Sequence, residues 1–282
     1  MRSVVVVGKG KVGSALARAG RSAGLRITTT AARKLPRSLP ASDLVIVACA
    51  DGAIESVARA LAPKLRIATC VAHCSGSIDA EALGVLRADG HAVGAMHPLA
   101  SFAHASAPPS LEGAALVVTG DTKARRACVR FGKKIGMRPI EPGKLHGPRY
   151  HAAAALLANG AAALADAATG LLVAAGIPPR LHGALLGPLL GSVAENVRKL
   201  GPAAALTGPI RRGDRVAVEK HLAAADAAGV GDLYRAAALA QIPIARRLGE
   251  APKDALDALE GVLKQGEARR SQERAIPRVR RL

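Results

Sequence analysis

The chain has 282 residues, half of them apolar, which is enough for one large domain or two smaller domains with cores of their own and excludes a disordered chain. Aromatic residues make up only 1% of the chain and Trp is absent, so a single-stranded nucleic-acid platform built on base stacking is excluded as well. The formal net charge of +19 raises nucleic acid or an anionic membrane as partners, but a dense part of it lies near the end of the chain and we expect the rest to be spread along it.

The first half of the chain alternates β-rich runs with helix-length segments. The strand-length runs are Val4–Val7, Arg26–Thr29, Leu44–Ala48, Ile67–Ala72, His91–Met96, Leu116–Thr119 and a short closing run at Arg138–Glu141. The helix-length segments are Val12–Ala23, Ala53–Leu61, Asp79–Arg87 and Thr122–Ile135. Such alternation predicts an α/β domain over 1–143, with a parallel doubly wound sheet covered by helices on both faces.

The second half of the chain is helical in pattern, because no long β-branched run follows Gly143. Its segments are Gly147–Ala175, Leu181–Leu200, Asp214–Ala227, Asp232–Leu248 and Pro252–Gln265. The sequence therefore predicts an all-α domain over 144–266 and a flexible basic tail over 267–282. The arginines of the tail are Arg269, Arg270, Arg274, Arg278, Arg280 and Arg281.

The cysteines and the apolar segments indicate the cellular compartment in which we expect the protein. The four cysteines form no CxxC pair, which favours a reduced, cytoplasmic protein. The N-terminal apolar run is too short for a signal peptide. The apolar stretch 152–176 is long enough to span a bilayer, but it is mostly Ala and carries Asn159 and Asp166, so we expect a buried helix and no membrane segment.

A glycine-rich loop follows the first strand and opens a helix. It matches the GxGxxG pattern that binds a dinucleotide pyrophosphate at a helix N-terminus. Its first glycine permits a tight turn, the second lets the backbone approach the phosphates, and the third lets helix and strand pack closely. The alternative is a glycine-rich turn without a ligand. The loop consists of Gly8, Lys9, Gly10, Lys11, Val12 and Gly13.

The end of the second strand predicts which dinucleotide binds. An NAD site places a carboxylate there for the ribose hydroxyls, and this chain has none. Thr30 and Arg33, with Lys34 behind them, are suited to hold a 2′-phosphate, so NADP is favoured. The alternative is a solvated basic loop.

Polar residues follow the ends of three neighbouring strands, where ligands bind in open α/β sheets. Ala50 and Asp51 follow one strand and are expected to wall the nicotinamide ribose, together with Cys74. Ser75 follows the next strand and His97 the one after it. Each of these residues has a structural alternative, Ser75 as a helix cap in particular, but their coincidence at one rim favours a catalytic role for at least one.

The first helix of the second half carries His151 and, two turns later, Asn159, on an otherwise Ala-rich segment. We expect this polar pair to line a cleft, with capping of buried groups as the alternative. Arg149 and Arg212 suggest an anionic substrate, while Asp214 is explained by capping the helix that follows it. A metal site at His73, Cys74 and His97 is a weaker hypothesis, because no two of these share a recognised zinc spacing.

Five motifs together resemble a known family: GKGKVG, AHCSGS, GAMHPLASF, YHAAA followed by Asn159, and LTGPIRRGD followed by HL. They resemble the bacterial Rossmann-like NADP oxidoreductases with a C-terminal helical domain of unknown function, of the DUF 2520 type. The resemblance covers nearly the whole chain except the tail. It implies a Rossmann domain followed by a helical domain of the 6-phosphogluconate dehydrogenase C-terminal-like type. The architecture is similar to that of pyrroline-5-carboxylate reductase, ketopantoate reductase and prephenate dehydrogenase.

The resemblance also implies roles for single residues. Prephenate dehydrogenases have His-Pro-Met where this chain has His97-Pro98-Leu99, which supports His97 near the nicotinamide but not the substrate. Ketopantoate reductases use a Lys and an Asn on the first helix of the second domain. Here Asn159 corresponds to the Asn, and His151 stands where the Lys is sought.

The sequence favours an NADP(H)-dependent oxidoreductase that moves a hydride to or from a small anionic carbonyl or imine. His97 or His151 is expected to donate the proton, because imidazole titrates near neutral pH, and Ser75 and Asn159 to orient the substrate. A non-catalytic NADP sensor, or nucleic-acid association through the basic tail, are the alternatives. A homodimer through the Ala-rich helix is also expected, because five helices are too few to bury its surface.

Overall fold

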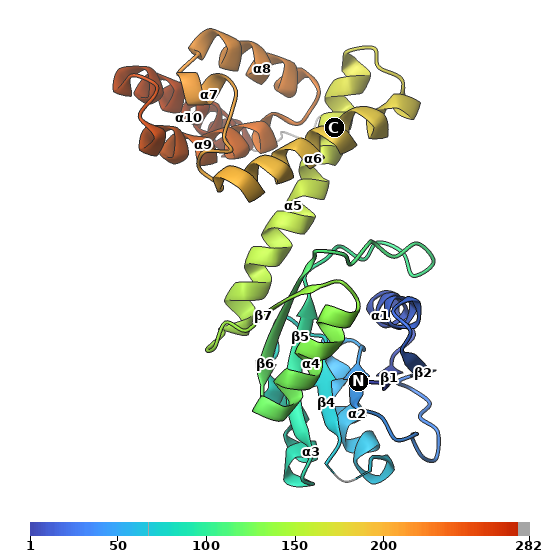
Figure 1. The fold of residues 1–282 in the computed structure, drawn as a ribbon. Helices are drawn as coiled ribbons and strands as arrows, with labels where there is room; N and C mark the ends of the chain where they lie inside the picture. Colours follow the sequence, from blue (N-terminus) through green and yellow to red (C-terminus); the bar gives the residue numbers. More distant parts are fainter. Residues whose placement is uncertain (67, 276–282) are drawn as a thin grey trace, which may run out of the picture. The chain divides into compact units, whose positions relative to one another are not determined.

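The computed structural model describes residues 1–66 and 68–275, and for 266–275 only the course of the backbone. The chain divides into two compact units, Met1–Ala158 and Asn159–Leu282 (Figure 1). The sequence predicts a boundary after Gly143, where the sheet ends, whereas the units divide inside a helix. The first turns of that helix belong to the first unit because they pack on the sheet's loops: a Cβ on Gly147 would lie 2.4 Å from the Ser77 carbonyl oxygen.

The first unit is built on a seven-stranded sheet with the order β2-β1-β3-β4-β5-β6-β7. Its strands are β1 (Ser3–Val7), β2 (Arg26–Thr30), β3 (Leu44–Val47), β4 (Cys70–His73), β5 (Ala92–Pro98), β6 (Ala115–Gly120) and β7 (Arg138–Ile140). β1 and β3 are buried on both faces, as their unbroken runs of β-branched and apolar residues predict. The α/β class and the seven strands are confirmed. The predicted start of the fourth strand, Ile67, lies outside the described residues.

One strand pair departs from the all-parallel sheet expected from the sequence. β5 and β6 run antiparallel, with His97 opposite Val117, while every other pair in the sheet is parallel. The connection from residue 99 to 114 contains no helix, so the chain turns back along β5 without crossing over the sheet. A parallel neighbour would need such a crossover.

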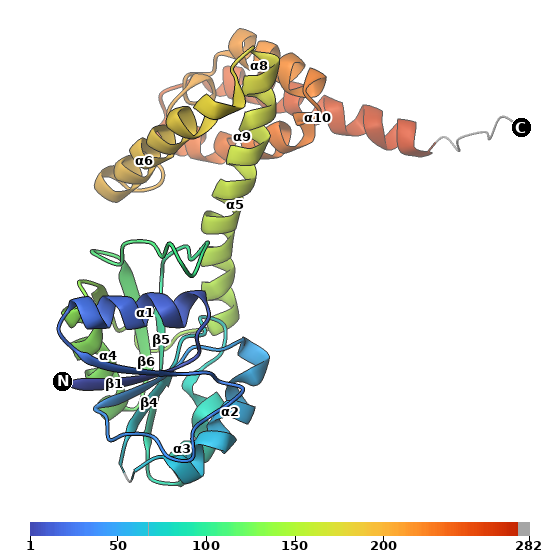
Figure 2. The same ribbon diagram turned by 90° about the vertical axis from the view of Figure 1, so that its right-hand side faces the viewer.

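Helices cover both faces of the sheet (Figure 2). α1 (Lys11–Ser22) and α4 (Thr122–Lys134) share one core with Val4 and Val6, and α2 (Ile54–Leu61) and α3 (Gly84–Ala88) share the other with Val5 and Val7. Short 3₁₀ turns precede or follow the second pair, at η1 (Asp51–Ala53), η2 (Ala62–Lys64) and η3 (Ala80–Leu83). Phe131 of α4 is fully buried, and truncating such a side chain costs about 3–5 kcal/mol.

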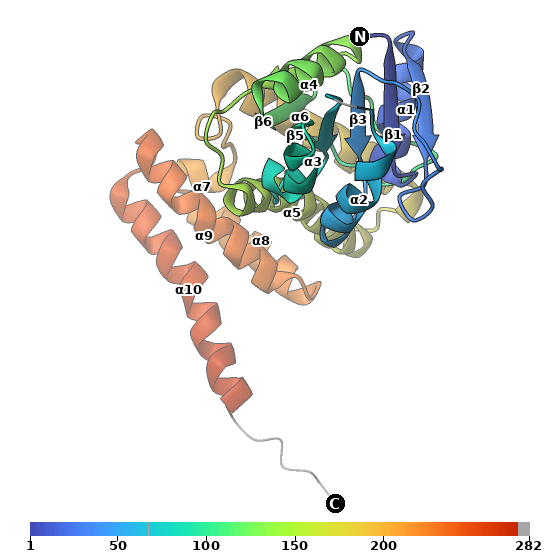
Figure 3. The ribbon, with the colours of Figure 1, turned by 90° about the horizontal axis from the view of Figure 1, so that it is seen from below.

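The second unit is helical throughout its described residues. After α5 (Gly147–Ala174), in which the units divide, come η4 (Pro179–Leu181), α6 (His182–Leu200), α7 (Pro209–Arg212), α8 (Arg215–Ala227), α9 (Gly231–Leu248) and α10 (Lys253–Ala275). α8, α9 and α10 lie side by side (Figure 3), around a core that includes Ile242 and Leu259. α10 continues past Gln265, where the sequence predicts its end, so the first part of the expected tail is helical. Residues 276–282 lie outside the described part of the chain.

The expectation that the Ala-rich helix is buried is wrong. α5 has no buried residue, and the core of the second unit is made by α7 to α10 instead. Several leucines are exposed on α5 and α6, among them Leu156, Leu157 and Leu189. α5 is also the one helix of the described chain that is long and apolar enough to cross a membrane, judged by length and composition alone.

Candidate functional site

The glycine loop between β1 and α1 has the geometry of a phosphate-binding turn. Gly8 has φ +130°, and a Cβ there would lie 2.0 Å from the Ala48 carbonyl oxygen, so only glycine fits. A Cβ on Gly13 would lie 2.1 Å from the Gly8 carbonyl oxygen. At Gly10 an added Cβ would meet nothing within 4 Å, so the space above the loop is open to a ligand.

A pocket of about 630 Å³ opens above this loop, and all its lining residues belong to the first unit. We call it the nucleotide pocket. Its lining includes most of the residues that the sequence singles out for cofactor or substrate: Gly8, Lys9, Gly10, Lys11, Val12, Arg33, Ala50, Asp51, Cys74, Ser75, His97 and His151. Burial raises the pKa of the Cys74 thiol to about 12, so this side chain is a neutral wall of the pocket and no nucleophile.

Four other candidates do not line the nucleotide pocket. Gly13 lies beneath the loop, as its packing role requires. Thr30 is buried and its hydroxyl donates to the Lys34 carbonyl oxygen at 3.5 Å, while Lys34 itself is exposed. Asn159 is exposed on α5, at the start of the second unit.

The loop after β4 is held by hydrogen bonds that involve His73 and Ser75. His73 is fully buried; its Nδ1 accepts from the Ser75 amide at 3.2 Å and its Nε2 donates to the Asp79 carbonyl oxygen at 2.8 Å. Burial lowers the pKa of His73, so its ring is neutral. The Ser75 hydroxyl accepts from the amides of Ser77 and Ile78, each at 3.2 Å. His73 therefore serves the fold, and the Ser75 oxygen is already engaged by the loop.

Asp51 joins this loop to the end of β3. The Ser77 hydroxyl donates to Asp51 Oδ2 at 2.6 Å, and the Ser77 and Ser75 hydroxyls lie 3.2 Å apart. The carboxylate is thus fixed at the rim of the nucleotide pocket, where a ribose hydroxyl can reach it.

A cluster of rings forms at the end of β5. His97 Nδ1 lies 2.7 Å from the Tyr150 hydroxyl, and the His97 and His151 ring centres are 5.7 Å apart. Gly76 makes room for both histidines, because a Cβ there would lie 2.9 Å from His97 Nδ1 and 3.0 Å from His151 Nδ1. The structure therefore brings the two candidate histidines together within the first unit.

The protonation of this cluster differs from the sequence expectation. Burial, and in second place the charge of His151, lower the pKa of His97 to about 4, so His97 does not titrate near neutral pH. Burial raises the pKa of Tyr150, which keeps its phenol protonated. A neutral His97 beside a protonated phenol can accept the Tyr150 proton at Nδ1 and present a proton at Nε2.

Tyr150 is a functional candidate that the sequence reasoning passed over. The chain has only two Tyr, and this one directly precedes His151 in the Tyr-His-Ala-Ala motif. Its place in that motif is a sequence signal that could have identified it as a site residue. Its partner on β5 lies 53 positions earlier, so the sequence alone does not pair them.

A second pocket, of about 390 Å³, adjoins the first and shares Ser75, Gly76 and His97 with it. Tyr150 and Thr119 add polar groups to its wall, and Val117 and Leu145 add apolar ones. Its one arginine, Arg87, is paired with Glu81 and with Asp121, the latter at 3.3 Å. The second pocket is a small chamber against the His97–Tyr150 pair.

Neither arginine of the anionic-substrate hypothesis lines these two pockets. Arg149 is exposed and Arg212 belongs to the second unit. Within residues 1–66 and 68–265, whose side chains the structure describes, no group of three His, Cys, Asp or Glu side chains is placed to hold a metal ion.

Comparison with known proteins supports the family resemblance. Residues 114–241 match the family model described as "Domain of unknown function (DUF2520)". The matched segment runs from the edge of β6 into α9, so it includes Tyr150, His151 and Asn159. No curated protein matches the chain significantly.

Solved structures share the fold. A structure named "putative NADP oxidoreductase BF3122 from Bacteroides fragilis" aligns over 85% of this chain and 97% of its own, with 20% identity and a TM-score of 0.66. Protein TM1727 from Thermotoga maritima aligns over 86% and 98%, with 21% identity and a TM-score of 0.60. A reductive aminase from Aspergillus terreus, in complex with NADPH4, cyclohexanone and allyl amine, aligns over 95% and 94%, with 18% identity and a TM-score of 0.54. At these identities the likeness establishes a Rossmann-like domain followed by a helical domain.

Proposed function

We propose, from the match of residues 114–241 to the DUF2520 family model, that this chain is an NADP(H)-dependent oxidoreductase acting on a small carbonyl or imine. The observation that carries the proposal is the His97–Tyr150 hydrogen bond, where the nucleotide pocket meets a second chamber. A proton-bearing pair between a nucleotide site and a small pocket is what reduction of a C=O or C=N bond requires. The similar structures of an NADP oxidoreductase from Bacteroides and a reductive aminase from Aspergillus favour the same chemistry.

The residues of the nucleotide pocket fit an anionic dinucleotide. The open space at Gly10 admits a pyrophosphate to the N-terminus of α1, and Lys9 and Lys11 add positive charge there. Asp51 is placed for a ribose hydroxyl. Arg33 lines the pocket beyond β2, where no carboxylate stands to repel a 2′-phosphate, so NADP(H) is preferred over NAD(H).

The bound cofactor would supply the hydride. The chain's own part is to hold the acceptor in the second pocket and to deliver a proton to the atom that gains negative charge. His97 Nε2–H is the donor to that atom, and Tyr150 restores the proton of the ring through Nδ1. The phenolate left on Tyr150 then takes a proton from solvent before the next turnover. Because His97 is half buried and neutral, it gives up its proton only as Tyr150 replaces it.

The residues that line the second pocket do not by themselves define the class of substrate. The second pocket is small, and its arginine is neutralised by two carboxylates, so the pocket itself does not select an anion. An anionic group on the substrate would need a cation beyond the lining of this pocket, such as the exposed Arg149. His151, beside His97 at the nucleotide pocket, is the remaining candidate of the first unit for orienting the carbonyl.

The test is NADPH oxidation across a panel of keto acids, simple ketones, and ketones mixed with primary amines, followed by absorbance of the reduced cofactor. Turnover of at least one member that falls sharply in Tyr150→Phe supports the proposal. Tight NADPH binding without turnover on the whole panel, in the presence of correctly folded protein, would favour the non-catalytic sensor instead.

We also propose that two copies associate through α5 and α6. Their exposed leucines include Leu157, at 75% exposed, and Leu189, at 60%, and exposed apolar patches of this kind mark interaction sites when they are contiguous. From Ala152 to Ala174 the only charged residue of α5 is Asp166, which leaves the close-approach surface that a second Ala-rich helix needs.

A further inference from the structure

The exposed cations of the first unit are spread over many segments, as expected from the sequence, and one group of them lies on α1 and α4. Both helices pack on the same face of the sheet, and they are neighbours, because a Cβ on Gly20 of α1 would lie 3.5 Å from Phe131 of α4. Neither helix contains an Asp or Glu. We call this surface the α1–α4 basic face; its exposed cations are Arg18, Arg21, Lys123, Arg126, Arg130, Lys133 and Lys134.

The cations of α4 form a stripe. At about 100° per residue, the five positions from Lys123 to Lys134 fall within an arc of about 100°, so they project from one side of the helix. They extend over about 17 Å of helix axis at 1.5 Å per residue. Measured along a duplex axis, this length spans about five base-pair steps of 3.4 Å.

These cations have no strong internal partner. Within the described part of the chain, no ion pair joins any of the seven to a carboxylate. Lys123 donates to the Ala68 carbonyl oxygen, and Arg130 acts weakly on Asp43, whose carboxylate is bound to the amides of Arg2 and Ser3. The other basic residue of α4 that is partly exposed, Arg125, is paired with Glu141. Seven charges thus remain available to an external anion.

The apolar and aromatic side chains of α1 and α4 indicate which kind of polyanion this face can bind. None of the exposed large apolar side chains of the described residues lies on α1 or α4, so the face lacks the wedge that anchors a helix in a membrane. It has no exposed aromatic ring on which unpaired bases would stack, since Phe131 is fully buried. A charged face without apolar or aromatic side chains suits a regular phosphate backbone.

We infer that the α1–α4 basic face binds the phosphate backbone of duplex DNA without reading its sequence. This activity is separate from the proposed reductase chemistry, because none of the seven cations lines the nucleotide pocket or the second pocket. It is also separate from the basic tail, whose last residues lie outside the described part of the chain.

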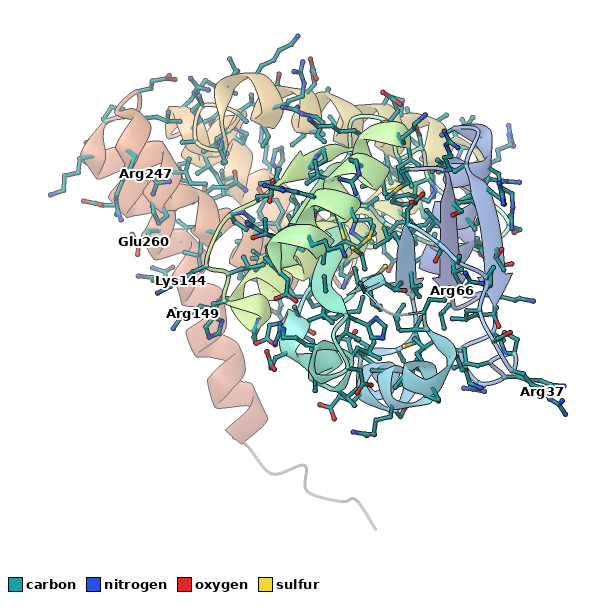
Figure 4. The ribbon with its side chains drawn as sticks, turned by 60° about the horizontal axis from the view of Figure 1, so that its bottom comes forward. Arg37, Arg66, Lys144, Arg149, Arg247 and Glu260 are labelled. Carbon is teal, nitrogen blue, oxygen red and sulfur yellow. The ribbon has the colours of Figure 1, made fainter. Side chains whose placement is uncertain are left out.

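The test compares two variants of the full chain that remove equal charge. The face variant carries Arg126→Gln, Arg130→Gln, Lys133→Gln and Lys134→Gln. The scattered variant carries Arg37→Gln, Arg66→Gln, Lys144→Gln and Arg247→Gln, four exposed cations on separate segments (Figure 4). Both variants retain the tail. Binding of a fluorescein-labelled duplex of about 24 bp is followed by anisotropy at several salt concentrations, because counterion release makes the salt slope a count of phosphate contacts.

The wild type should show a slope of log affinity against log salt of about −4 or steeper. The face variant should lose about 3 to 4 of that slope and at least about 100-fold in affinity near 0.1 M salt, while the scattered variant stays within about one unit of slope. Equal losses in the two variants would overturn the inference, because net charge alone would then explain binding. Tighter binding to a single strand of the same length or to phosphatidylserine vesicles would overturn it as well.

Two further variants serve as controls, one that keeps the charge of the face and one that lacks the end of the tail. A variant with Arg126→Lys and Arg130→Lys keeps the charge and should keep the wild-type slope. A chain lacking residues 276–282 should bind the duplex with a slope within about one unit of the full chain. Loss of binding in either would overturn the inference. NADPH affinity is measured in every variant, and unchanged affinity shows that the first unit is folded.

Discussion

The hydroxyl of Tyr150, in the first turn of α5, lies 2.7 Å from Nδ1 of His97 at the end of β5, with the two rings edge to face at a centre distance of 5.4 Å. This contact fixes the start of α5 to the carboxyl end of the sheet. It also gives the half-buried, neutral imidazole of His97 a partner that carries a proton.

Tyr150→Phe should lower kcat by about 10²-fold or more, because the relay loses the group that reprotonates His97. NADPH affinity should change little, since Tyr150 lines the second pocket and not the nucleotide pocket. Steady-state kinetics and NADPH titration measure both effects. The control is Tyr234→Phe, which removes a similar contact, 3.2 Å to His221 Nδ1, in the second unit. An equal fall of kcat in both variants would contradict a special role for Tyr150.

The stability of the protein should fall as pH drops from about 6.5 to about 4. His97 has its pKa lowered to about 4 in the folded chain, while an unfolded His titrates near 6.5, so the unfolded state binds more protons in this window. The free energy of unfolding therefore rises with pH there and levels off above 6.5. After allowing for the solvent that reaches the half-buried ring, His97 contributes about 2 kcal/mol to this dependence.

Urea unfolding at several pH values measures that dependence. His97→Asn should flatten the curve between pH 4 and 6.5, by about 2 kcal/mol, relative to the wild type. Part of the slope should remain, because burial also lowers the pKa of His73. Parallel curves for wild type and variant would mean that the His97 ring is as easily protonated in the folded chain as in the unfolded one.

Arg33→Asp should reverse or abolish a preference for NADPH over NADH. Losing a charge-assisted contact to the 2′-phosphate costs about 1.5–3 kcal/mol, which is about 10- to 100-fold in affinity. Calorimetric titration of both cofactors gives the ratio. Lys34→Asp is the matched control and should have the smaller effect, because Lys34 does not line the nucleotide pocket. If the wild type binds NADPH and NADH with equal affinity, the proposed contact of Arg33 with the 2′-phosphate is wrong.

Gly76→Ala should disturb both histidines at once. The added Cβ would lie 2.9 Å from His97 Cε1 and 3.0 Å from His151 Nδ1, so both rings must shift. Overpacking of this kind costs about 1–3 kcal/mol of stability, and we expect a loss of kcat of at least about tenfold. Gly261→Ala, where an added Cβ meets nothing within 4 Å, should leave kcat unchanged. Wild-type kinetics in Gly76→Ala would show that the ring cluster does not need its present geometry.

Light scattering should return a mass of about twice the 28.6 kDa of one chain at micromolar concentration. Leu189→Glu on α6 should shift the chain to monomer, because it places a charge within the exposed apolar surface. Val216→Glu on α8 is the control, with a similarly exposed side chain at 63% against 60% for Leu189, and should not change the mass. A monomeric wild type would rule out the proposed association.

The local parts of the nucleotide site follow from the amino-acid sequence alone. Runs such as Val4 to Val7 define central strands, and the glycine spacing defines the loop, because strand burial and turn geometry depend on residues close together in the chain. Most of the residues predicted for the cofactor line one pocket for this reason.

The tertiary structure decided what depends on long-range packing. The contact of Tyr150 with His97 joins residues 53 positions apart, and the low pKa of His97 arises from burial by segments that no periodicity reveals. β6 runs antiparallel to β5 because their connection lacks a crossover helix, which composition did not show. The exposure of α5 also depends on long-range packing. Its apolar pattern predicts that its surface is buried against another element, but α5 has no buried residue and the core of the second unit is formed by α7 to α10.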